Sequence, residues 1–118
     1  MSHVVTVEAK CTDEGAIRAA CRRLGAECLG YGRHALYQGP LNGLGVQLKG
    51  WQYPLVINTG SGQVRFDNYE GRWGDARELD RFKQAYAVCR ARAEAESQGA
   101  EIEEERLADG SVRLVIQA

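Results

Sequence analysis

The stretch Gly71-Arg72-Trp73-Gly74 contains side chains that could bind a ligand or a partner. The indole of Trp73 can be displayed for stacking, or it can fold beneath the start of the helix that is expected to follow. Arg72 and Arg77 flank that helix start, where free backbone N–H groups attract anions. No glycine-rich phosphate-loop spacing accompanies them, and a Trp at a strand-to-helix corner is more often an anchor of the fold. Arg72, Trp73 and Arg77 are therefore the candidate residues for binding a ligand or a partner, and no catalytic residue is assigned.

A thiol-dependent enzyme is an alternative, because nucleophilic catalysis needs a Cys or Ser beside a base. The chain has two histidines, His3 and His34, and four cysteines, namely Cys11, Cys21, Cys28 and Cys89. Cys28 or Cys11 would act with His34, whereas Cys21 and Cys89 fall on apolar helix stripes and are expected in the core. Five residues separate Cys28 from His34, and no second pair completes a tetrahedral zinc site. We expect free thiols, no metal and no cofactor.

The distribution of charge favours a protein partner. Residues 18–33 carry four arginines opposed by one glutamate, whereas residues 94–105 carry six glutamates and no base. If the fold separates these segments, the molecule is strongly dipolar despite a net charge of −1, which suits docking to a protein or head-to-tail self-association. Glu101, Glu103 and Glu105 alternate along an expected strand and share one face, which is either a solvated edge, the favoured interpretation, or a surface for a cationic partner.

Nucleic-acid binding is a second alternative and is less well supported. An open sheet face with Tyr53, Phe66 and Tyr69 could stack bases, but the aromatic-rich signature of RNA-binding sheets is absent. The net charge is close to zero, so no global field attracts nucleic acid. We therefore do not expect nucleic acid as the main partner.

The first half of the chain predicts a strand and a helix, followed by a β-meander. Residues 4–8 are β-rich, and Thr12 or Asp13 can cap a helix that Gly25 ends. Residues 30–50 are rich in glycine and predict a loose segment with short strands at 35–37 and 46–48. Residues 53–58 and 63–67 then predict a hairpin around a short glycine-containing connection.

The second half predicts a long helix and a terminal hairpin. Apolar residues at three- and four-residue spacing, with Asp75 as the cap, predict a helix over 75–98 that Gly99 closes. Residues 100–107 and 111–116 are expected to pair around Asp109-Gly110. The resulting order predicts an α+β fold, in which two helices pack on one face of a mostly antiparallel sheet and leave the other face open. Such a fold is ferredoxin-like or a duplicated β-α-β-β unit, because the first helix ends in Leu-Gly-Ala-Glu and the second in Gln-Gly-Ala-Glu.

Length and composition predict one domain over residues 1–118. The chain is 44% apolar and 26% charged, which suits a single hydrophobic core. It shows neither a basic and apolar leader at its start nor a run of apolar residues long enough to span a bilayer. We expect a soluble, cytoplasmic protein.

Several segments resemble a family of domains of unknown function. They are Met1-Ser2-His3, Tyr37-Gln38-Gly39, the 53–67 hairpin, Trp73 ahead of a helix with Phe82 and Tyr86-Ala87, and the ending Asp109-Gly110-Ser111-Val112-Arg113-Leu114. The family includes a hypothetical open reading frame of algal chloroplasts and its cyanobacterial and other bacterial relatives. The resemblance implies no known catalytic residues, and it points to an accessory role because bacterial relatives tend to be encoded beside AAA+ ATPases. A small binding or accessory module, with an AAA+ ATPase as the suspected partner, is therefore our leading interpretation of the sequence.

Overall fold

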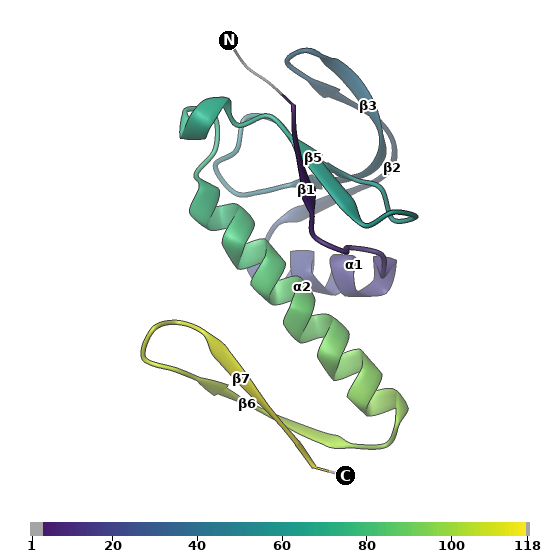
Figure 1. Cartoon of the computed structure of the whole chain (residues 1–118), viewed down its shortest axis with the longest axis vertical. Helices are drawn as coiled ribbons and strands as arrows, with labels where there is room; N and C mark the ends of the chain where they lie inside the picture. The colour runs from purple at the N-terminus through teal and green to yellow at the C-terminus, as the bar shows by residue number, and fades with distance from the viewer. Residues whose placement is uncertain (1–3, 118) are drawn as a thin grey trace.

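The computed structural model describes residues 4–117 and, within them, has two α-helices and two antiparallel sheets (Figure 1). Along the chain the elements are β1 (Val5–Glu8), α1 (Glu14–Leu24), β2 (Glu27–Leu36), β3 (Gly39–Gln47), β4 (Leu55–Ile57), β5 (Gln63–Phe66), a 3-10 turn (Tyr69–Gly71), α2 (Ala76–Ser97), β6 (Glu101–Arg106) and β7 (Val112–Gln117). The α+β class and the mostly antiparallel pairing predicted from sequence are confirmed.

Both helices begin and end where the sequence signals place them. The Asp13 side chain accepts the backbone N–H of Ala16 at 3.1 Å, and Gly25, at φ 71°, ends α1. Asp75 caps α2 in the same way, and Gly99 follows the helix at φ 76°. Glycine suits these last positions because a left-handed φ costs it little. At 22 residues, α2 is about 33 Å long.

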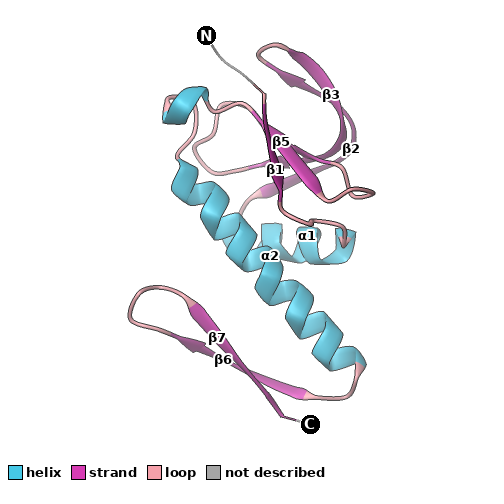
Figure 2. Cartoon of the chain, in the orientation of Figure 1, coloured by secondary structure: helices cyan, strands magenta, loops and turns pink. Residues whose placement is uncertain are grey.

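The larger sheet has the strand order β1-β5-β4-β3-β2, and every neighbouring pair is antiparallel. Figure 2 shows α1 and α2 on the same side of this sheet. Fully buried side chains fill the space between the layers, among them Ile17 of α1, Phe82 of α2 and Leu44, Leu55 and Val64 of the sheet. The helices therefore pack on one face, as the sequence predicted.

The prediction for residues 30–50 was wrong, because two long paired strands replace the loose segment with its short strands. Glycines were interpreted as strand breakers, yet Gly45 lies within β3 beneath the ring of His34. A Cβ at Gly45 would come within 2.6 Å of that ring, so this glycine permits a close approach across the sheet. Val56 lies on the same face and is only 1% exposed, so the face away from the helices is covered here rather than open.

The hairpin of β6 and β7 forms a sheet of its own beside α2 (Figure 1). The order strand, helix, strand, strand occurs twice, in β1-α1-β2-β3 and in β5-α2-β6-β7, but only the first of these two hairpins joins the larger sheet. Glu104 of β6 forms ion pairs with Arg92 of α2 and Arg23 of α1. The basic and acidic segments are therefore not separated as the dipole interpretation required, because they meet at Glu104.

Candidate functional site

The corner between β5 and α2 is built on a left-handed turn. Tyr69, Glu70 and Gly71 have φ values of 48°, 54° and 94° in succession. The turn is closed by backbone hydrogen bonds, including one of 2.9 Å from the N–H of Trp73 to the carbonyl of Asn68. Glycine tolerates such a φ, whereas each non-glycine residue there costs about 1–2 kcal/mol. The backbone of two non-glycine residues, Tyr69 and Glu70, is therefore strained at this corner.

Four aromatic rings gather at the corner, with Trp73 in the centre. The ring centroid of Trp73 lies 5.1 Å from that of Tyr37, 5.4 Å from that of Tyr53 and 4.8 Å from that of Tyr69, on which it stacks. Trp73 is only half-buried, and Tyr37, at the turn between β2 and β3, is 62% exposed. We call Tyr37, Tyr53, Tyr69 and Trp73 the aromatic corner.

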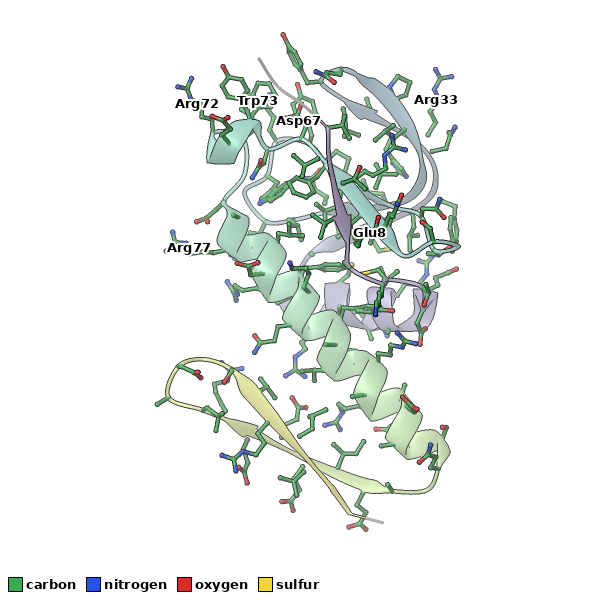
Figure 3. All side chains as sticks on the ribbon, in the orientation of Figure 1. Glu8, Arg33, Asp67, Arg72, Trp73 and Arg77 are labelled. Atoms are coloured by element: carbon green, nitrogen blue, oxygen red, sulfur yellow. The ribbon has the colours of Figure 1, made fainter. Side chains whose placement is uncertain are left out.

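Two ionisable residues, Arg72 and Asp67, contact Tyr69 of the aromatic corner. The guanidinium carbon of Arg72 lies 5.0 Å from the centroid of the Tyr69 ring, which is a cation–π contact. Asp67 is 1% exposed, and its Oδ1 accepts the backbone N–H of Tyr69 at 3.1 Å. Its Oδ2 is buried without a hydrogen-bond partner among the described residues. Figure 3 shows Asp67, Arg72 and Trp73 together at one end of the molecule.

Arg77 does not join this site. Its side chain is 86% exposed and forms an ion pair of 2.8 Å with Asp75, and Figure 3 shows it on α2, apart from Arg72. Hydrogen bonds from the Arg77 side chain and then from its backbone N–H lower the pKa of Asp75. The carboxylate of Asp75 therefore already occupies the helix N-terminus, where the sequence analysis had considered an external anion. Of the three predicted binding residues, the structure brings together Arg72 and Trp73.

Trp51, and not Trp73, is the tryptophan anchored beneath the start of α2. Trp51 is 6% exposed, its Nε1–H donates to the carbonyl of Asp75 at 3.0 Å, and its ring packs edge-on against Phe66. The anchoring role expected for Trp73 belongs to a residue that lies 24 positions before Asp75 in the chain. Local sequence signals could not reveal this, since the contact is made only in the folded chain.

The base-stacking surface considered for nucleic acid is not present as expected. Phe66 is 6% exposed and belongs to the core between sheet and helices, whereas Tyr53 and Tyr69 join the aromatic corner. The three rings therefore do not share one open sheet face.

The thiol and imidazole of the enzyme alternative lie on opposite faces of the sheet. Cys28 is paired with Val46 and packs against the core, whereas the His34 ring lies over Gly45 on the other face and contacts the carbonyl of Gly30 at 3.0 Å. Cys11 is completely buried, and burial raises the pKa of its thiol to about 11. His3 lies outside the described residues. Among residues 4–117 the structure therefore forms no pair of cysteine and histidine suited to nucleophilic catalysis.

A groove of about 680 Å³ separates α2 from the β6–β7 hairpin. Its lining is partly apolar and includes four arginines, Arg23, Arg77, Arg81 and Arg106. The first three of these form ion pairs with carboxylates, so the groove offers little free positive charge. It is separate from the aromatic corner, whose rings do not line it.

Comparison of the chain with protein-family models, curated proteins and solved structures found no match. The described residues contain no cluster of three or more His, Cys, Asp and Glu side chains that could hold a metal ion. Within that same part of the chain, neither helix is long and apolar enough to cross a membrane. The family resemblance noted from sequence remains a prediction, and function must be argued from the aromatic corner.

Proposed function

We propose that this protein is a small accessory module that docks a partner protein through the aromatic corner. The observation that carries the proposal is the half-buried Trp73 ring, which three tyrosines from separate segments surround at the surface. Tryptophan, tyrosine and arginine supply most of the binding energy in protein interfaces, because they bury a large area and keep a polar end. Because Arg72 lies over the Tyr69 ring, tryptophan, tyrosine and arginine occur together at this surface.

The shape of the corner favours a protein over a small molecule. Small-molecule sites are concave and enclose most of the ligand. Tyr37 projects from the turn between β2 and β3 with more than half of its surface exposed, and the groove beside α2 is lined by other residues. A partner would therefore cover the corner rather than enter it.

The family resemblance supports an AAA+ ATPase as the partner, and we propose the cytoplasm as the place where the two meet. An accessory role also agrees with the separation of Cys28 from His34, which leaves the thiol alternative without its base. No catalytic residue is proposed.

The experiment is an affinity pull-down of the tagged protein from lysate of its own host, with bound proteins identified by mass spectrometry. Tyr37→Ala and Trp73→Ala are compared with wild type, and Glu96→Ala, on an exposed site near the end of α2, is the control. Circular dichroism and thermal unfolding establish that each variant is folded. Tyr37→Ala matters most, because the exposed ring can be removed without opening the core.

We expect wild type and Glu96→Ala to recover an AAA+ ATPase in stoichiometric amount. Each corner variant should bind the purified partner about 30-fold more weakly, as for the loss of an interface side chain worth about 2 kcal/mol. Equal recovery by both folded corner variants would contradict docking at the aromatic corner. A wild-type sample that captures no ATPase would contradict the proposed partner.

A further inference from the structure

Two cysteines are brought together where α1 meets β2. Cys21 lies one helical turn after Arg18 on α1, so the two side chains share a face of the helix. Gly25 ends α1 with a left-handed turn, and the N–H of Ala26 donates to the carbonyl of Cys21 at 2.9 Å. This turn directs β2 back along α1, and Cys28 packs against the core cluster that contains Cys21.

The surroundings of the two thiols differ. Cys21 is 2% exposed, and burial, followed by the neighbouring Cys28 thiol, raises its pKa to about 11. Cys28 is partly exposed, and Nη1 of Arg18 donates to its sulfur at 3.5 Å. Reactive cysteines are typically accessible and lie beside a cation, whereas buried ones are inert. Cys28 therefore has the setting of an attacking thiol, and it packs against the core cluster to which Cys21 belongs.

The other cysteines are not paired in this way. The charged neighbours of Cys11 are Lys83 and Arg90, and those of Cys89 include Arg23 and Glu104. All four cysteines are free thiols in the structure.

We propose that Cys21 and Cys28 form a reversible disulfide when the protein meets a peroxide. In the first step the Cys28 sulfur attacks one peroxide oxygen, the O–O bond breaks, and Cys28 becomes a sulfenic acid while water leaves. In the second step the Cys21 sulfur attacks the Cys28 sulfur, the S–O bond breaks, and a second water leaves. Two thiols are oxidised and one hydrogen peroxide is reduced to two waters. The product ties the end of α1 to the base of the hairpin whose tip carries Tyr37.

The second step depends on pH, because burial raises the pKa of the Cys21 thiol to about 11. The nucleophile is the Cys21 thiolate, and with a pKa of about 11 it makes up about one part in ten thousand at pH 7. Arg18 and Arg22 lower the pKa of Cys21, but their effect is smaller than the increase caused by burial and by Cys28. Closure of the disulfide should therefore accelerate about tenfold for each pH unit between 7 and 10.

The test is to treat the reduced, full-length protein with hydrogen peroxide at pH 8 and to measure its intact mass without reductant. Disulfide formation lowers the mass by about 2 Da, and dithiothreitol restores it. Trypsin cleaves after the flanking arginines, so a peptide of residues 19–22 should be joined to a peptide of residues 24–33. Dimedone in a parallel sample traps the sulfenic acid at Cys28 and should prevent the cross-link.

Variants identify the role of each thiol. Cys21→Ala should accumulate oxidised Cys28, which adds about 16 Da or more, without a cross-link. Cys28→Ala should leave Cys21 unreactive in the folded protein. A double variant with Cys11→Ala and Cys89→Ala should still lose about 2 Da. Cross-links that join any other cysteines would overturn the proposal, as would a wild-type Cys28 that stays reduced or is oxidised step by step without forming a disulfide.

Discussion

Replacement of Gly74 by Ala should destabilise the fold because the new methyl group collides with Trp51. A Cβ at position 74 would lie 2.4 Å from Cδ2 and 2.6 Å from Cε2 of the indole, whereas carbon atoms in ordinary contact lie about 3.5–4.0 Å apart. The backbone of Gly74 is not in the left-handed region, so the substitution introduces no strain in φ. The effect of Gly74→Ala therefore isolates the steric contact.

The size of the effect follows from how firmly Trp51 is held. Its ring must move by more than 1 Å, roughly the shortfall from an ordinary contact, yet it packs edge-on against Phe66 and donates a hydrogen bond to the carbonyl of Asp75. Overpacking a core costs about 1–3 kcal/mol, and leaving a buried N–H without its partner costs about as much again. Alanine regains about 0.4–1 kcal/mol by restricting the unfolded chain. We expect a net loss of about 3 kcal/mol, or about 12 °C in Tm for a chain of this size.

Urea unfolding followed by circular dichroism would measure the free energy of unfolding of Gly74→Ala against Gly32→Ala. Gly32 lies in β2, has no atom within 4 Å of the position of a new Cβ, and is not in the left-handed region. Its replacement should leave stability unchanged or raise it by up to about 1 kcal/mol. If Gly74→Ala proves as stable as Gly32→Ala, the close packing of Trp51 does not require a glycine at position 74.

Two further predictions concern contacts that hold separate parts of the chain together. The Tyr86 hydroxyl accepts hydrogen bonds of 3.1 Å from two backbone N–H groups that precede α1. Tyr86→Phe should therefore lower the free energy of unfolding by about 1–3 kcal/mol. Denaturant unfolding of the two proteins at pH 7 measures the change, and equal midpoints would contradict this role. Arg23, through its hydrogen bond, and then Arg92 lower the pKa of Glu104 below its usual 4.5. The folded state therefore favours the ionised carboxylate, and this stabilisation is present above pH 4.5 and is lost as the pH falls through the lower folded value. Wild type should be more stable than Glu104→Gln at pH 7, and the difference in their Tm values should shrink as the pH is lowered to 3. A difference in Tm that stays constant over this range would refute the contribution of the ion pair.

The parts of the fold that depend on local signals were predictable. Asp13, Gly25 and Asp75 mark helix ends through hydrogen bonds and φ angles that depend on residues only a few positions away. The hairpin of β4 and β5 and the hairpin of β6 and β7 were likewise predicted from glycines between β-rich runs. The sequence could not show that β6 and β7 pair apart from the larger sheet, because that depends on which face of α2 receives them.

Residues 30–50 show where local interpretation fails. Glycine was taken as a sign of a loop, but at Gly43 and Gly45 a Cβ would collide with Ile57 or with His34. These glycines are required by neighbours that are remote in sequence or that lie across the sheet. The turn between β2 and β3 brings Tyr37 into contact with Trp73. Because these strands were not predicted, Tyr37 was not identified as a member of the candidate site.

The stretch Gly71-Arg72-Trp73-Gly74 lies at the corner between β5 and α2, where its two glycines have different roles. Gly71 permits the left-handed turn that presents Arg72 and Trp73, whereas Gly74 leaves room for the ring of Trp51. Because Trp51 already fills the space beneath the helix start, Trp73 has no apolar pocket there and lies at the surface among three tyrosines. A half-buried tryptophan that is outside the core cluster and follows the strained residues Tyr69 and Glu70 supports the proposed docking of a partner at this corner. The corner sequence therefore serves the fold through its glycines and is proposed to serve binding through Arg72 and Trp73.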